Sequence, residues 1–254
     1  MKKLLLGIFL MGFVFVFVQG AAQATLYSFG DESIHWPGWK DNHYTSHNTQ
    51  DVVGTPNLRG GVVDVGNDGY LDYVKIFYSS VGSDYSAGDL FIDLDGDQYW
   101  DYVVHNTYSN TSGHYRGISS SKLYQTHIAL DSQTAYLLSQ DTWHFGNHVS
   151  SFRNDHPTVL KDVSNLQSLG NVSVTDFDHN LNGQPIPAGT AVVFDFTDIT
   201  SGTNWNWGNA IIGFSPTCSN DVIYSHVPEP ATVLLIGFGL VGLGLCSSSK
   251  MRKG

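Results

Sequence analysis

Two apolar segments, one near each end of the 254-residue chain, limit what the chain can fold into. They span residues 4–18 and 231–246 and contain no charged residue. Segments of this kind are typical of signal peptides and membrane spans, so we expect the folded domain between them, in residues 25–226. About 200 residues are enough for one sizeable hydrophobic core, and this length favours one domain over two.

Residues 1–24 have the three parts of a secretory signal peptide. A pair of lysines precedes the apolar stretch, and Ala22 and Ala24 match the small residues that precede a cleavage point. The sequence therefore predicts a signal helix that is removed after Ala24, so that the mature chain begins at Thr25. The alternative is an uncleaved membrane anchor, which the short apolar stretch and the cleavage pattern disfavour.

The acidic residues of the middle part favour a β fold. Residues 25–228 contain 22 acidic and 7 basic residues, a net charge of −15, and Glu32 is the only glutamate among them. Aspartate favours turns and is a poor helix former, whereas glutamate is a good one. The negative charge would repel the phosphates of nucleic acids, so nucleic acid is not an expected partner. Cations are the small partners that such a surface favours.

Alternation of apolar and polar residues predicts several strands. They lie in residues 121–140, 171–177 and 189–199. In the last of these segments Val192, Phe194 and Phe196 lie on one face of the strand. A short helix is predicted only for residues 157–170, which have a proline at the start and a glycine at the end. We predict an all-β fold, an antiparallel, jelly-roll-like β-sandwich flanked by the N-terminal signal helix and a C-terminal transmembrane helix.

One segment of the chain is repeated. Residues 64–74 read DVGNDGYLDYV and residues 93–103 read DLDGDQYWDYV, 29 positions further on. Each copy lies between strand-like runs, so we interpret them as two related hairpins in one sheet system. Two copies are too few for a repeat architecture.

The turn of the second copy is a candidate calcium site. Asp93, Asp95 and Asp97 occupy positions 1, 3 and 5, Asp101 occupies position 9, and Tyr99 could add its backbone carbonyl. This spacing resembles the first nine residues of an EF-hand-type or dockerin-type loop, whose alternate carboxylates converge on one ion.

Two departures weaken the resemblance to such a loop. Gln98 stands at position 6, where these loops have glycine, and Val104 at position 12 replaces the bidentate acid. The first copy has Gly66 in place of the acid at position 3. The alternative interpretation is therefore a pair of acidic hairpin turns without a metal.

Two pairs of tryptophans offer a second candidate site, Trp36 with Trp39 and Trp205 with Trp207. Exposed tryptophan faces beside Asn and Asp are suited to stacking on sugar rings, which would make the domain a carbohydrate-binding module. The alternative is that these side chains pack in the core. Coplanar, exposed rings would distinguish the first interpretation from the second.

The C-terminal end combines three features in a fixed order. Pro228, Glu229 and Pro230 precede the apolar run of residues 231–246, and a basic cluster follows in residues 250–253. The run is slightly short for a bilayer core, and basic residues favour the cytoplasmic side of a membrane. A buried terminal helix, the alternative, would not explain the basic cluster.

Residues 227–254 resemble the PEP-CTERM sorting signal of bacterial exosortase substrates, in the Pro-Glu-Pro motif, the glycine-bearing span and the basic end. The resemblance implies that residues 231–246 hold an exported precursor in the inner membrane. It also implies that an exosortase-type enzyme acts at Pro228, Glu229 and Pro230. The product would then reach the cell surface or the extracellular polysaccharide matrix.

The sequence thus predicts an exported surface or matrix protein with a binding or structural role, and no cofactor other than calcium. A carbohydrate-binding module is one alternative. A hydrolase whose carboxylate pair meets only in the folded chain is the other. No G-x-S-x-G elbow, zinc-protease helix motif or phosphate loop occurs in the sequence, so no catalytic residue is predicted.

Overall fold

A computed structural model describes residues 24–31, 36–37, 56–80, 86–108, 118–132, 134–138, 156–175, 191–199, 202–203, 205–217, 219 and 221–227. These residues form antiparallel strands and one 3-10 turn, η1 (Trp207–Asn209), which confirms the predicted all-β class. Within these ranges no helix is long and apolar enough to cross a membrane. The signal helix and the transmembrane helix expected at the ends lie outside the described residues, so the structure gives them no support.

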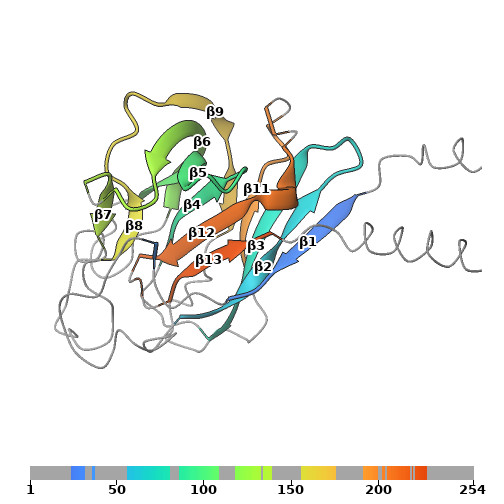
Figure 1. The fold of residues 1–254 in the computed structure, drawn as a ribbon, viewed down its shortest axis with the longest axis horizontal. Helices are drawn as coiled ribbons and strands as arrows, with labels where there is room; N and C mark the ends of the chain where they lie inside the picture. The colour runs from blue at the N-terminus through green and yellow to red at the C-terminus, as the bar shows by residue number, and fades with distance from the viewer. Residues whose placement is uncertain are drawn as a thin grey trace, which may run out of the picture.

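Two large sheets carry most of the strands (Figure 1). The five-stranded sheet has the order β1 (Thr25–Phe29), β2 (Asn57–Val65), β3 (Leu71–Ser80), β11 (Ala191–Asp195) and β10 (Ser173–Thr175). The six-stranded sheet has the order β13 (Ile223–His226), β12 (Ile211–Pro216), β4 (Ala87–Asp93), β5 (Tyr99–Tyr108), β6 (Ile118–Ala129) and β9 (Gln167–Asn171). Short turns join β2 to β3 and β4 to β5, whereas β11 and β12 arrive from distant parts of the sequence.

The two large sheets share one hydrophobic core. On β11 the predicted alternation holds, because Val192 and Phe194, and Phe196 just beyond the strand, are fully buried. The ring of Phe194 meets Phe214 of β12 edge-on, with centroids 5.9 Å apart. Each such buried side chain contributes about 1.5–3 kcal/mol to folding, so the alternating residues hold the two sheets face to face.

A small third sheet covers part of the outer face of the six-stranded sheet. It consists of β7 (Tyr136–Leu138) and β8 (Pro157–Leu160), at the left end in Figure 1. Beneath it lies a second, aromatic core in which Trp36, Phe91, Trp100 and Tyr136 pack together. The ring centroids of Trp36 and Phe91 are 5.2 Å apart.

The helix predicted for residues 157–170 is not formed. Its first part is β8, whose four residues are all buried and pair with β7, and its last part enters β9 of the six-stranded sheet. A short apolar run does not distinguish a buried strand from a helix by its periodicity. Pairing with a distant strand decided the outcome here.

The repeated segments form two hairpins, as predicted, but in different sheets. Residues 64–74 form the β2–β3 turn of the five-stranded sheet, and residues 93–103 form the β4–β5 turn of the six-stranded sheet. Thr203 and Trp205, which precede η1, each contact one of the two hairpins. The amide of Leu71 donates to the carbonyl of Thr203, and Trp205 stacks on Tyr102 at 4.2 Å between centroids. The two acidic turns therefore lie at the same end of the molecule.

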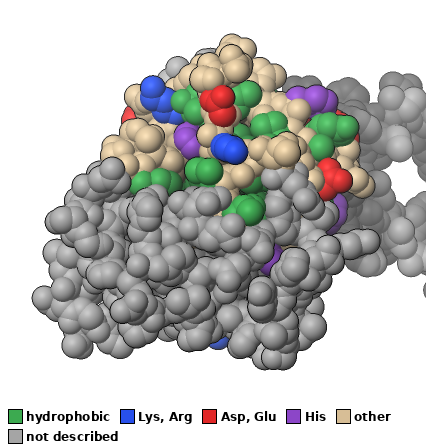
Figure 2. Space-filling view, turned by 90° about the vertical axis from the view of Figure 1, so that its left-hand side faces the viewer, with side chains coloured by type: hydrophobic (Ala, Val, Ile, Leu, Met, Phe, Trp, Pro, Cys, Tyr) green, Lys and Arg blue, Asp and Glu red, His purple; other side chains and the backbone are tan. Residues whose placement is uncertain are grey.

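The side of the molecule on the left in Figure 1 carries side chains of mixed chemical type where it is described. In Figure 2 its described hydrophobic side chains are interspersed with polar, acidic, basic and histidine side chains. No single chemical type dominates the described part of this face, so it does not by itself indicate a class of partner.

Candidate functional site

The β4–β5 turn is built around the buried carboxylate of Asp93, the last residue of β4. Its Oδ1 accepts hydrogen bonds from the amides of Gly96 at 2.7 Å and Asp95 at 3.2 Å, and its Oδ2 accepts one from Gln98 at 3.3 Å. Burial raises the pKa of Asp93, these amides oppose the rise, and the charge of Asp101 adds to it. The carboxylate thus organises the loop by bonding its backbone.

Three of the four predicted carboxylate ligands come together. Oxygens of Asp93, Asp95 and Asp101 lie within 4.8 Å of one another. Asp101 also accepts a hydrogen bond from the amide of Leu94 at 2.8 Å, and its pKa is raised by burial first and then by the charges of Asp95 and Asp97. Asp97 is not in this group, and its Oδ1 accepts from the amide of Tyr99 at 2.9 Å.

The loop makes a sharp turn at position 6 although it has no glycine there. Gln98 has φ 74°, in the left-handed region, although it is not glycine. Position 6 of an EF-hand-type loop carries a glycine for the sharp turn, so Gln98 adopts a conformation that its residue type disfavours. The adjoining Tyr99 begins β5 and is partly exposed, and its ring stacks on His127 with centroids 4.3 Å apart.

The β2–β3 turn shows why the two copies differ at position 3. A Cβ atom on Gly66 would lie 2.9 Å from carboxylate oxygens of both Asp68 and Asp72. An aspartate there, like Asp95 in the second copy, would not fit unless those side chains moved. The first copy is therefore an acidic turn of a different shape.

The tryptophan pairs do not provide the exposed, coplanar rings that a sugar-stacking surface requires. Trp36 and Trp207 are each 1% exposed, and the Nε1 of Trp36 donates to the carbonyl of Leu130 at 3.2 Å. Trp205 is half-buried, and its ring is inclined at 56° to that of Trp207. Trp39 lies outside the described residues. The described tryptophans belong to the packing of the fold.

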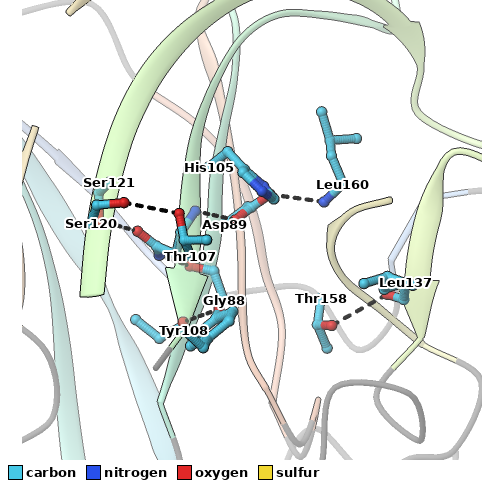
Figure 3. A network of polar contacts seen from close by, with 12 residues as sticks. Gly88, Asp89, His105, Thr107, Tyr108, Ser120, Ser121, Leu137, Thr158 and Leu160 are labelled. Carbon is cyan, nitrogen blue, oxygen red and sulfur yellow. Dashed lines mark hydrogen bonds and ion pairs between the residues drawn. The ribbon is translucent and has the colours of Figure 1, made fainter. Parts of the chain in front are cut away.

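A buried polar network that the sequence did not reveal lies between the six-stranded sheet and β8 (Figure 3). Asp89 of β4 is fully buried. Its Oδ2 accepts hydrogen bonds from the amide of Leu160 at 2.8 Å and pairs with Nδ1 of His105 at 2.9 Å, and its Oδ1 accepts from the amide of Asn106 at 2.8 Å. One carboxylate therefore joins β4, β5 and β8.

The pKa of His105 is raised above its ordinary value of 6.5. Burial alone would lower it, but the charge of Asp89 and the hydrogen bond to it outweigh that effect. The protonated imidazole is thus the form that the pair favours. The signal in the sequence was an aspartate inside the apolar strand AGDLFID, whose seven residues are all buried. A buried aspartate requires partners.

The described part of the fold ends at Val227, directly before the Pro-Glu-Pro motif. Val227 is buried, and its amide donates to the carbonyl of Ala210 at 2.7 Å. The motif residues Pro228, Glu229 and Pro230, the apolar run after them and Ala22 lie outside the described residues. At the other end Ala24 is the first described residue, and β1 starts immediately after it.

The C-terminal segment contains a known sequence motif. Residues 226–250 match the PEP-CTERM protein-sorting motif. This is a PEP-CTERM tail. The tail marks a secreted protein that is processed by an exosortase-type enzyme and sorted to the cell surface. The match covers the tail alone, and no curated protein and no solved structure matches the chain.

Proposed function

We propose that the chain is a cell-surface or matrix protein that is cut at both ends during export. A signal peptidase removes residues 1–24, residues 231–246 hold the precursor in the inner membrane, and an exosortase-type enzyme cuts at Pro228, Glu229 and Pro230. The remaining β-sandwich then serves a binding or structural role, with extracellular polysaccharide as its expected surroundings.

The observation that carries this proposal is the position of the fold between the two cuts. The described strands run from Thr25 of β1 to His226 of β13, so they lie between the two expected processing sites. Val227 is held by Ala210 and β1 pairs with β2 from Thr25 onward, so neither cut removes any strand or core residue of the part of the chain that the structure describes. A domain that is to remain after processing must have this property.

The proposal is tested by expressing the full chain in two strains of one exosortase-containing host, with and without the exosortase. We expect the protein on the surface of the first strain and in the membrane fraction of the second, where it keeps its tail. Equal surface amounts in both strains would refute sorting by this enzyme. Immunoblots of cell fractions with an antibody against the β domain measure the difference.

We propose further that the β4–β5 turn binds calcium weakly. The donor set supports this, because the three oxygens that come together are carboxylate oxygens, which hard cations prefer. Each carboxylate has about four acceptor positions, so the backbone hydrogen bonds of Asp93 leave room for a cation. Three carboxylates are fewer than a full EF-hand offers, and a Kd on the order of 10⁻⁴–10⁻³ M is expected.

Calcium should raise the melting temperature of the processed protein. For a Kd of about 10⁻³ M, 10 mM calcium would add roughly 1.4 kcal/mol to the free energy of unfolding, or about 3–6 °C. The variant Asp95→Ala should abolish most of this rise, whereas Asp97→Ala should retain most of it, because Asp97 is not in the carboxylate group. Melting curves that coincide in chelator and in 10 mM calcium would leave an acidic turn without a metal.

A further inference from the structure

The β2–β3 turn has a negative charge that no residue of its own balances. Residues 64–72 contain three aspartates and no lysine or arginine. The pKa of Asp72 is raised, first by burial and then by the charges of Asp68, Asp64 and Asp195 of the neighbouring strand β11. A positive group beside this turn would therefore be stabilising.

The strand β1 brings the start of the mature chain to this turn. Thr25 pairs with Val65, the last residue of β2 before the turn, and Leu26 pairs with Asp64. The amide of Ala24 donates to Oδ1 of Asn67, at the tip of the turn, at 2.6 Å. Figure 1 shows β1 beside β2 at the edge of the sheet. In the precursor the nitrogen of Thr25 is an uncharged amide.

We propose that the α-ammonium group created at Thr25 by signal-peptide removal binds at the β2–β3 turn, beside Asn67 and Asp68, and stabilises the exported form of the fold. This inference rests on the export and cleavage proposed above. Cleavage removes Ala24, the donor to Asn67, and the ammonium group lies one residue away, about 3.8 Å along the chain. It carries three N–H donors, whereas the nitrogens of Ala24 and Thr25 together carry two in the precursor.

The turn is arranged to receive this group. Asp68 accepts a hydrogen bond from the amide of Tyr70 at 3.1 Å through Oδ1, which fixes its carboxylate at the tip of the turn next to Asn67. An α-amino group ordinarily has a pKa of about 7.7–8.0, so it is charged at neutral pH. Because the precursor has no charge at this nitrogen, only the cleaved chain gains the interaction.

The stabilisation by the α-ammonium group should depend on pH. The carboxylates of the turn are Asp64, Asp68 and Asp72, and Asp195 of β11 adds its charge to theirs at Asp72. Negative charges beside a bound ammonium group would raise its pKa in the folded protein. The stabilisation is then complete below the pKa of the unfolded chain and disappears as the pH rises through the folded value.

The α-amine can be titrated directly in the mature protein. The full chain is exported from its host, the processed protein is purified and its N-terminus is sequenced. Its amines are then dimethylated with ¹³C-formaldehyde, which leaves them able to take up a proton. The NMR signal of the α-amine is followed against pH in the folded protein and in urea. We expect its pKa to be about half a unit higher in the folded protein, the size typical of one exposed ion pair.

Two variants separate a specific contact from a general effect of charge. Asp68→Asn should bring the folded pKa of the amine back to the urea value. Asp131→Asn, which removes the same charge from an exposed turn after β6, should leave it raised. A chain that begins at Thr25 with equal folded and urea values would overturn the inference and leave export intact. A mature chain that begins elsewhere would overturn both the cleavage position and the inference, while sorting at the C-terminus would stand.

Discussion

Replacing Asp89 with alanine should lower the free energy of unfolding of the processed domain by about 3–5 kcal/mol. The carboxylate is fully buried and accepts from the amides of Leu160 and Asn106 and from His105. Its removal leaves these donors without their acceptor in the interior, where each costs about 1–3 kcal/mol. The free energy of unfolding of natural domains is about 5–15 kcal/mol in total, so the variant should be close to unfolding. Urea denaturation followed by tryptophan fluorescence measures the difference.

The control for this prediction is Asp131→Ala, at an exposed position, which should change the free energy of unfolding by less than about 0.5 kcal/mol. A loss of less than about 1 kcal/mol in Asp89→Ala would show that the carboxylate does not hold β8 to the sheet.

The same pair should give the domain a pH-dependent stability. The pKa of His105 is raised in the folded protein, so the pair contributes fully below pH 6.5 and its contribution disappears as the pH rises through the folded pKa. The stability difference between the wild type and His105→Gln should therefore be larger at pH 6 than at pH 9. A difference that is equal at both values would contradict a charged pair. Urea unfolding at the two pH values measures it.

Deleting residues 231–254 should abolish delivery to the cell surface. The apolar run and the basic cluster are the anchor that we propose, so we expect the exported chain without them to stay unprocessed in the periplasm or the medium. The described fold ends at Val227, so the deletion should leave the stability of the domain unchanged. Cell fractionation and circular dichroism check the two expectations.

A second variant separates the motif from the span. Replacing Pro228, Glu229 and Pro230 by alanine keeps the apolar run, and this variant should stay uncut in the membrane fraction. If the deletion variant reached the surface as efficiently as the full chain, the sorting signal would lie elsewhere.

Features that depend on neighbours in the sequence were predictable. The alternation of Val192, Phe194 and Phe196 identified β11 and its buried face, because a strand exposes every second residue to the same side. The Asp- and Gly-rich turns located both repeated hairpins, because those residues favour turn conformations. The motif at the C-terminus was readable for the same reason, since its three parts follow one another along the chain.

Features that depend on distant pairing were not predictable. Asp89 and the amide of Leu160 are 71 positions apart, and nothing near either residue announces the contact. The strand β8 was mistaken for a helix because its partner β7 is what makes it a strand. The sequence around Trp207 does not reveal whether its side chain is exposed. Only the packing of the sheets shows that it is buried, with 1% of the side chain exposed.

The cluster of three carboxylates in the β4–β5 turn was predictable only in part. The spacing of Asp93, Asp95 and Asp101 predicted that they would converge, and they do. Asp97 lies outside this group, and its Oδ1 accepts a hydrogen bond from the amide of Tyr99. The spacing of the aspartates along the chain did not indicate that Asp97 would lie outside the group.

If the protein is sorted to the surface through its PEP-CTERM tail, the C-terminus of the surface-located protein must differ from that of the precursor. The protein is released from the surface of the exosortase-containing host, digested, and its C-terminal peptide is identified by mass spectrometry. We expect a peptide that ends at or beside Pro228, Glu229 and Pro230, with residues 231–254 absent. A surface-located protein that still carries residues 231–254 would contradict this expectation.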